Sequence, residues 1–323
     1  MKNKKLYLPA LLAVCVMIAG SCGNAAQTAQ STQTAAETTT TAQEQTTESE
    51  VTTVPETEET TTTTTADEAP VFTGGYETAE KEFYRDGKKI AGKLFMPNGS
   101  GNFPAVILSH GFGANMSNVE GYAKAFADEG IAAYIFDFIG GGNDIQSDGE
   151  MKEMSVLTEA EDLNVVFDGV AALDGIDPDK MFLMGESQGG FVSSYVAATR
   201  PDDICGLVAL YPAYSLQDDS WQRTPDINDI PETMNIMGKT LGRIYNYDAM
   251  SFDIYDMLPD YDGKVLLIHG TADNLVPLSY SERAAETFPD AELITIEKAG
   301  HGFGGKAFRE AAQLAVDFVK GLI

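Results

Sequence analysis

Cysteine is scarce in this chain of 323 residues, which holds three. Cys15 and Cys22 lie within the first 22 residues, so Cys205 is the only cysteine in the remainder of the sequence. A disulfide framework is therefore excluded, although an exported protein could form one. Histidine is equally rare, and no group of His and Cys has the spacing of a zinc site. We expect no metal centre.

Positive charge is also sparse, because 21 Lys and Arg face 49 Asp and Glu, for a net charge of −28. The first 22 residues carry +3 and residues 27–68 carry −9, which leaves −22 for the sequence from Ala69 onward. So acidic a domain is not suited to bind nucleic acid. Its mean field also disfavours anionic substrates, so a neutral substrate is expected.

Long apolar runs are lacking as well. Residues 6–20 follow Lys2, Lys4 and Lys5, and this run of about 15 residues is shorter than the roughly 20 that a transmembrane helix needs. A secretory signal peptide over residues 1–22 fits better. The sequence Ala19-Gly20-Ser21-Cys22 resembles a bacterial lipobox, and a plain signal peptide cut nearby is the alternative. We expect an exported cell-surface lipoprotein whose lipid on Cys22 is its only membrane contact.

The next segment has almost no apolar side chains. Between residues 27 and 68 there is no Lys or Arg, and Thr dominates, as in the runs 38–41 and 60–65. Such a composition cannot bury enough surface to offset the entropy of ordering. Residues 23–69 are therefore predicted to form a disordered tether.

Residues 70–323 have the pattern of one α/β domain. Two alternating runs around Arg85-Asp86-Gly87 predict a hairpin over residues 81–97. Strand patterns and helical patterns then alternate along the chain. The strand patterns lie at residues 105–109, 131–138, 181–184, 206–211, 265–268 and 293–296. The helical patterns lie at residues 117–130 (capped by Ser117), 154–173, 189–199, 278–287 and 307–322. The alternation predicts a mostly parallel sheet with helices on both faces. It stops after Pro212, so an insertion over about residues 214–262 is expected.

A nucleophile is indicated by Gly185-Glu186-Ser187-Gln188-Gly189. Gly-x-Ser-x-Gly alone is a weak pattern, but here an apolar strand precedes it and a helix follows it. The glycines permit a sharp turn that lifts the Ser187 hydroxyl above the sheet, and the helix N-terminus stabilises developing negative charge. A glycine-rich turn with an incidental serine is the alternative.

The general base follows by elimination among three histidines. Only His301, in Gly300-His301-Gly302, comes after both Ser187 and a suitable acid, as the chain order serine, acid, histidine requires. His110 and His269 each follow or end a strand, and we expect both to shape turns by hydrogen bonding.

Asp273 is the predicted acid. It lies in a turn after the strand that ends at His269, at the carboxyl edge of the sheet where ligands bind in open α/β folds. Its role would be to hold His301 in one tautomer. Asp218 and Asp219, after the preceding strand, are rivals, and a helix-capping role for Asp273 is the structural alternative.

An oxyanion hole needs N–H donors that are in place before the reaction. We nominate the N–H of Gln188, directly after the nucleophile, and that of Phe112 in His110-Gly111-Phe112-Gly113.

From about Tyr76 onward the chain resembles the α/β-hydrolase superfamily, and within it the bacterial feruloyl/cinnamoyl esterases, which are related to serine aminopeptidase-like hydrolases. The matching motifs are Ser109-His-Gly-Phe, Phe136-Asp-Phe, Met184-Gly-Glu-Ser-Gln-Gly-Gly190, His269-Gly-Thr-Ala-Asp273 and Gly300-His-Gly-Phe303. The resemblance implies an α/β-hydrolase fold and hydrolysis of carboxylic esters through an acyl-enzyme, without a cofactor. The chain departs from it at Ile139-Gly140-Gly141-Gly142, where many relatives have Arg-Gly-His-Gly.

The resemblance also implies that the insertion is a small lid over the acyl pocket. Its aromatic and methionine side chains, Trp221 among them, suit an apolar or aromatic acyl group, and a small core of the lid itself explains them equally well. We expect a neutral ester substrate, hydroxycinnamoyl or acetyl groups of plant polysaccharide. A peptidase of the proline-iminopeptidase type and a catalytically inactive surface binding module are the alternatives, and the oligomeric state is left open.

Overall fold

A computed structural model describes residues 69–323. The predicted signal peptide, the lipidation site at Cys22 and residues 23–68 of the predicted tether lie outside the described residues. Within residues 69–323, no helix is both long enough and apolar enough to cross a membrane.

Eight strands form the central sheet, in the order β1-β2-β4-β3-β5-β6-β9-β10. β1 pairs antiparallel with β2, and β2 with β4, whereas all other neighbours are parallel. The strands are β1 (Val71–Arg85), β2 (Lys88–Ser100), β3 (Phe103–Ser109), β4 (Ala132–Phe136), β5 (Ile176–Glu186), β6 (Gly206–Leu210), β9 (Lys264–Gly270) and β10 (Ala291–Ile296). The predicted mostly parallel sheet is confirmed.

The strand sequences explain the positions of the strands in the sheet. Every residue of β3, β4 and β6 is buried, which matches their continuous apolar runs, because helices cover both faces of a parallel sheet. β1 and β2 are joined by a two-residue turn in which Asp86 has φ 52° and Gly87 has φ 79°. Positive φ at both central positions is the geometry that suits a tight hairpin.

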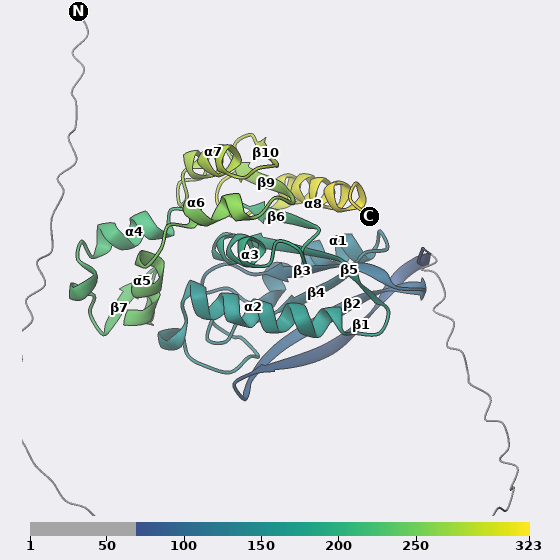
Figure 1. Ribbon diagram of the computed structural model, residues 1–323, viewed down its shortest axis with the longest axis horizontal. Coiled ribbons are helices and arrows are strands. Elements are labelled where there is room, and N and C mark those ends of the chain that lie inside the picture. The colour runs from purple at the N-terminus through teal and green to yellow at the C-terminus, as the bar shows by residue number, and fades with distance from the viewer. Residues whose placement is uncertain (1–68) are drawn as a thin grey trace, which may run out of the picture. The chain divides into compact units, whose positions relative to one another are not determined.

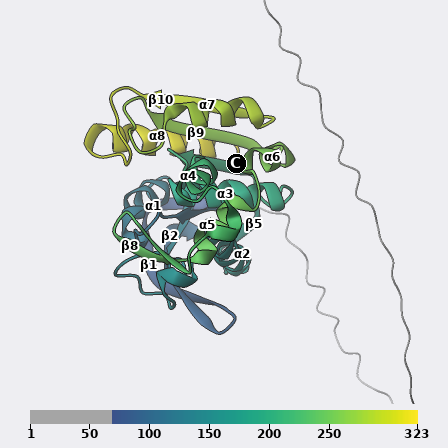
Figure 2. The same ribbon diagram turned by 90° about the vertical axis from the view of Figure 1, so that its left-hand side faces the viewer.

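Helices pack on both faces of the sheet and form two cores. The core on one face includes Ala123 and Phe126 of α1 together with Ala315 of α8. The other core is built on α2, α3 and α7. The bounds are α1 (Glu120–Ala127), α2 (Val156–Ala171), α3 (Gln188–Thr199), α7 (Leu278–Thr287) and α8 (Gly305–Lys320), and Figures 1 and 2 show their arrangement.

The predicted start of α1 is wrong. A short 3-10 turn, η1 (Met116–Asn118), precedes the helix, and the Asn115 side chain caps this turn by accepting the Ser117 N–H at 3.0 Å. α1 itself begins at Glu120, and its N-cap residue, Val119, makes no side-chain capping hydrogen bond. Asn115 already provides the capping oxygen one turn earlier, so Ser117 lies inside the turn instead of capping the helix.

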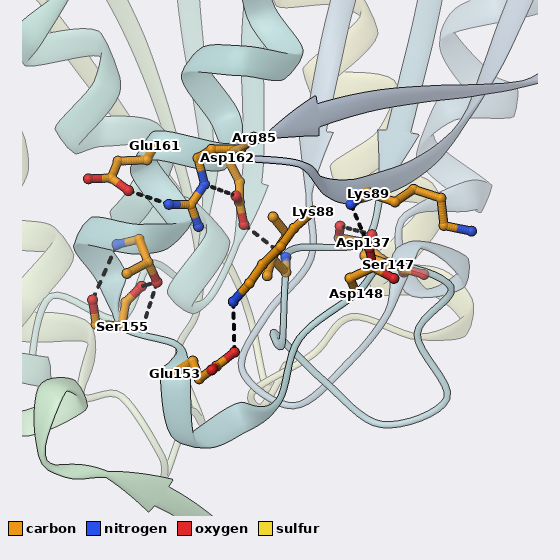
Figure 3. Close-up of polar contacts among 12 residues, drawn as sticks. Arg85, Lys88, Lys89, Asp137, Ser147, Asp148, Glu153, Ser155, Glu161 and Asp162 are labelled. Carbon is orange, nitrogen blue, oxygen red and sulfur yellow. Dashed lines mark hydrogen bonds and ion pairs between the residues drawn. The ribbon is translucent and has the colours of Figure 1, made fainter.

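The tip of the β1–β2 hairpin is tied to the loop after β4 and to α2 (Figure 3). Arg85 donates from Nε to Asp162 Oδ1 at 2.6 Å, and the other oxygen of Asp162 accepts the Ile139 N–H at 2.8 Å. Lys88 Nζ donates to Glu153 Oε2 at 2.8 Å. These contacts fix residues 139–153, which border the carboxyl edge of the sheet.

The segment between β6 and β9 forms elements of its own within the predicted range 214–262. These are α4 (Leu216–Arg223), η3 (Ile227–Asp229), the two-stranded β7 (Thr233–Ile236) and β8 (Lys239–Gly242), α5 (Arg243–Met250), α6 (Ile254–Met257) and η4 (Leu258–Asp260). α4, α5 and β7 lie together at one end of the sheet, in the left part of Figure 1 and toward the viewer in Figure 2. Leu241, Tyr245 and Leu258 anchor the segment in the core shared with α2 and α3.

Candidate active site

Ser187 occupies the turn between β5 and α3. Its backbone has φ 53° and ψ −117°, a conformation that is strained for a residue with a side chain. A Cβ on Gly185 would lie 2.2 Å from the Gly189 carbonyl oxygen, and a Cβ on Gly189 would lie 2.4 Å from that of Ser109. Only glycine fits these two positions, so the flanking glycines of the motif make the turn possible.

The three residues predicted from chain order meet in one hydrogen-bonded row. His301 Nε2 lies 2.8 Å from Ser187 Oγ, and His301 Nδ1 lies 2.8 Å from Asp273 Oδ2. The Asp273 carboxylate is fully buried, whereas the His301 side chain is 18% exposed. An acid, an imidazole and a hydroxyl in this order can transfer the hydroxyl proton to the imidazole and stabilise the imidazolium.

Asp273 is held by more contacts than its pattern indicated. Its Oδ1 accepts the N–H groups of Leu275 and Val276 at 2.8 and 3.0 Å. His269 Nε2 lies 3.3 Å from Asp273 Oδ2 and 3.0 Å from the Val276 carbonyl oxygen, so this nitrogen faces two acceptors and carries the proton. Burial lowers the pKa of His269, so the ring stays neutral and orients the carboxylate without charge.

The remaining candidates lie elsewhere. His110 is buried, and its Nε2 accepts the Phe138 N–H at 3.2 Å, which is the structural role predicted for it. Asp218 accepts a hydrogen bond from the Tyr280 hydroxyl, and Asp219 one from the Ser215 hydroxyl. Neither rival acid is hydrogen-bonded to His301 among the described residues.

The two nominated oxyanion donors flank Ser187. Gln188 is the first residue of α3, so its N–H has no acceptor within the helix. The Phe112 N–H has no hydrogen-bond acceptor among residues 69–323. A Cβ on Gly111 would lie 3.2 Å from the Ser187 Cβ, so the absence of a side chain there leaves room beside the hydroxyl. This arrangement can receive a carbonyl oxygen that becomes negative during attack.

The glycine run that departs from the resemblance supports the Phe112 loop. The Gly113 N–H donates to the Gly141 carbonyl at 3.1 Å, and a Cβ on Gly142 would lie 1.7 Å from the Ala114 carbonyl oxygen. The two loops therefore pack backbone against backbone. Larger residues are excluded at Gly142 because they would push the Phe112 loop away from Ser187.

Ser187 and His301 open into a cavity of about 350 Å³. Its lining is largely apolar and aromatic, with Phe112, Leu216, Ile236, Met237, Tyr245 and Phe303. Two charged side chains of α4, Asp219 and Arg223, also face it. Arg223 Nη2 is held by Ser220 Oγ at 2.8 Å and Asn246 Oδ1 at 3.0 Å. Residues 69–323 contain no cluster of three or more His, Cys, Asp or Glu side chains suited to a metal ion.

Comparison with known families agrees with this geometry. Residues 102–254 match the family described as serine aminopeptidase, S33, and residues 254–318 match the family described as TAP-like protein. The chain belongs to the α/β-hydrolase superfamily. A third match, to the New glue protein family, covers residues 1–93, which include the Thr-rich segment.

This hydrolase has curated relatives whose names are those of thioesterases and lipases. It is 25% identical over 224 residues to the mitochondrial palmitoyl-protein thioesterase ABHD10 of Mus musculus, covering 64% of this chain and 72% of the relative. It is 28% identical over 132 residues to the monoglyceride lipase of Homo sapiens. It is also 27% identical to the quorum-quenching protein AidA of Acinetobacter baumannii, of which it spans 39% of the length.

Solved structures share the fold of the hydrolase. Est1E of Butyrivibrio proteoclasticus, solved with ferulic acid bound, superposes with a TM-score of 0.67 at 24% identity, covering 75% of this chain and 96% of Est1E. The mouse α/β hydrolase domain-containing protein 10 superposes with a TM-score of 0.59 at 21% identity, covering 76% and 98%. At these identities the likeness establishes the fold alone.

Trp221, predicted to contact substrate, lies outside the cavity of the hydrolase. Its side chain is 39% exposed and is not part of the cavity lining. α4 turns Leu216, Asp219 and Arg223 inward, and Trp221 falls between these positions on the other side of the helix. Of the aromatic and methionine side chains of the insertion, only Met237 and Tyr245 line the cavity.

Two site residues were missed by sequence reasoning. The Tyr211 ring packs edge-on against His301 with ring centroids 4.8 Å apart, and its hydroxyl donates to Glu186 Oε2 at 2.8 Å. Burial raises the pKa of Glu186, whose position is the variable one before Ser187. Tyr211 follows β6 and Glu186 ends β5, both at the carboxyl edge of the sheet. That placement is the feature of the sequence that could have indicated them as site residues.

A buried carboxyl group beside the site predicts a pH effect on stability. Burial raises the pKa of Glu159 well above 4.5, and neighbouring Asp162 raises it further. The folded state thus holds this proton more tightly than the unfolded state, so the free energy of unfolding falls as the pH rises from 4.5 to the folded pKa. In Glu159→Gln the part of this decline that comes from Glu159 should be absent, whereas Asp162, whose pKa burial raises to about 6, still contributes. Urea titrations across that range measure the difference. Glu310→Gln, at an exposed position with no ion pair among the described residues, is the control. Parallel profiles for wild type and Glu159→Gln would contradict the expectation.

Proposed function

We propose that the hydrolase cleaves neutral carboxylic esters by forming an acyl-enzyme on Ser187. The observation that carries this proposal is the hydrogen-bonded row from Ser187 through His301 to buried Asp273 at the edge of a cavity. A serine hydroxyl next to an oriented imidazole is the arrangement used for nucleophilic catalysis on acyl groups.

The steps follow from the positions of the groups. His301 Nε2 takes the Ser187 proton while Oγ attacks the ester carbonyl carbon, and Asp273 stabilises the imidazolium. The carbonyl oxygen becomes negative between the N–H groups of Phe112 and Gln188. As the tetrahedral intermediate collapses, the alcohol leaves with the proton from His301. A water molecule then gives a proton to His301 and attacks the acyl carbon, which releases the acid and restores Ser187.

For the acyl group we propose a hydroxycinnamoyl (feruloyl) moiety. A cavity of about 350 Å³ is larger than an acetyl group requires and falls at the lower end of the range for small-molecule sites. Its aromatic lining suits a phenyl ring, and the Arg223 guanidinium in its wall can donate to a ring hydroxyl or methoxy oxygen. Est1E, solved with ferulic acid, shares the fold. Attachment of the natural ester to plant polysaccharide, and a surface anchor at Cys22 outside the described residues, stay predictions of the sequence.

A substrate panel tests this proposal. The full chain would be assayed on methyl ferulate, methyl cinnamate, methyl acetate, palmitoyl thioester and proline p-nitroanilide, so that the three methyl esters differ in the acyl group alone. We expect the highest kcat/KM with methyl ferulate, at least about tenfold above the acetate ester, because more of the cavity is filled. Activity confined to the anilide would contradict the esterase function, and a preference for the palmitoyl thioester would contradict the acyl group proposed.

A further inference from the structure

One side chain of the insertion reaches the turn that carries Ser187. Tyr245 of α5 is 3% exposed, and its hydroxyl donates to Gln188 Oε1 at 2.7 Å. The amide of Gln188, itself 1% exposed, donates from Nε2 to Glu159 Oε2 at 2.8 Å. Both ends of the Gln188 amide are therefore hydrogen-bonded, the oxygen to Tyr245 and the nitrogen to Glu159.

The same tyrosine also contacts the other side of the site. Its ring packs against Phe112 with the ring centroids 5.5 Å apart and the ring planes inclined by 53°. Tyr245 therefore touches both residues whose N–H groups are proposed to bind the oxyanion. The two residues come from separate segments, one after β3 and one after β5, and the Tyr245 side chain contacts a residue of each.

We propose that Tyr245, a residue of the insertion, is a positioning residue for the oxyanion hole. It holds Gln188 and Phe112 so that their backbone N–H groups point at the same oxygen. This proposal rests on the acyl-transfer function at Ser187. The insertion then does more than cover the pocket, because its placement decides whether the two N–H groups converge on one oxygen.

The strain at the turn gives a physical reason for such support. Ser187 has φ 53°, and a residue in that conformation persists only when its surroundings constrain it. Gln188 begins α3 without a side-chain cap to fix the start of the helix, so a buried amide held at both ends restrains its backbone. Without the Tyr245 hydroxyl, Oε1 of Gln188 is left buried and unpaired.

The matched control is Tyr214. It is 1% exposed, and its hydroxyl shares a hydrogen bond with Ser194 Oγ at 2.6 Å, so Tyr214→Phe also removes a buried, bonded hydroxyl at the start of the insertion. Among the hydrogen bonds and ring contacts of residues 69–323, Tyr214 makes none with Gln188 or Phe112. A general loss of packing would affect both tyrosine variants, whereas loss of oxyanion positioning would affect Tyr245→Phe alone.

The test compares an ester with its thionoester, in which sulfur replaces the carbonyl oxygen. Sulfur is a poor hydrogen-bond acceptor and gains little from the N–H groups, so the ratio of kcat/KM for oxoester over thionoester reports on the oxyanion hole. Tyr245→Phe should lower kcat for the oxoester at least about tenfold and lower the ratio with it, while KM changes less than about threefold. Tyr214→Phe should leave the ratio unchanged.

A second variant and a second readout keep the proposal open to refutation. Gln188→Met removes the acceptor of the Tyr245 hydroxyl and should lower the oxoester-to-thionoester ratio by a similar factor. In the double variant Tyr245→Phe/Gln188→Met the ratio should be no lower than in either single variant. Phosphonylation of Ser187 by a fluorophosphonate places an oxygen in the same hole, so its rate should fall in both variants. The positioning role would be overturned by equal losses of kcat/KM for oxoester and thionoester, by a rise in KM alone, or by additive effects of the two substitutions. An unlabelled wild-type Ser187 would instead overturn the proposed function together with this inference.

Discussion

Replacing Ser187 with alanine should lower kcat for ester hydrolysis by about 10⁵-fold, because the acyl-enzyme can no longer form. His301→Ala should cost a similar factor, and the double variant should be no slower than either single one. These residues form one hydrogen-bonded row, with 2.8 Å between Ser187 Oγ and His301 Nε2, so removing either abolishes the same step. Steady-state rates with p-nitrophenyl esters measure the loss.

A buried serine nearby provides the control for this substitution. Ser193 lies in α3, is fully buried, and its hydroxyl has no partner among the described residues. Ser193→Ala should keep kcat within about twofold, since a hydroxyl without a partner contributes little. If Ser187→Ala retained more than a hundredth of the wild-type rate, the proposed nucleophile would be wrong.

Replacing Gly189 with alanine should be nearly as damaging, for a steric reason. The added Cβ would lie 2.4 Å from the Ser109 carbonyl oxygen and 2.5 Å from that of His110, and both are backbone atoms that cannot rotate away. The turn must then move off the end of β3, which takes Ser187 away from His301. We expect kcat to fall at least about a hundredfold and the free energy of unfolding to fall by about 3 kcal/mol.

Gly304→Ala is the matched control for this steric effect. Gly304 lies near His301 in sequence, has an extended backbone with φ −130°, and has no neighbour within 4 Å of an added Cβ. As the N-cap of α8 it should lose about 1 kcal/mol or less, with the rate unchanged. Urea unfolding and steady-state kinetics of the two variants separate a steric cause from general intolerance of alanine. Equal behaviour of both variants would show that close backbone packing at Gly189 is not the cause.

The order of strands and helices could be predicted from the sequence because each element has the local pattern of its environment. Buried parallel strands such as β4 are apolar throughout, and helices such as α8 show a clear apolar face. Three histidines in the whole chain made elimination possible, and chain order then selected His301 and Asp273. These signals are local or follow from topology, so no knowledge of packing was required.

What could not be predicted depends on contacts between distant segments. The hydroxyl of Tyr245 meets Gln188 at a separation of 57 residues, and no local pattern marks that pairing. The outward position of Trp221 depends on which face of α4 packs inward, and a helix of eight residues carries too little periodicity to decide this. At Ser117 the capping pattern fails, because Asn115 caps the 3-10 turn that precedes α1.

In the proposed mechanism, Ser187 carries the acyl group between the two halves of the reaction. Rapid mixing of the full chain with excess p-nitrophenyl ester, followed by an acid quench and mass spectrometry of peptides, tests this most directly. We expect a burst of nitrophenol equal to the enzyme concentration, together with one acyl group on the peptide that contains Ser187. Acyl groups found on another residue, or turnover without any acylated peptide, would rule out Ser187 as the nucleophile.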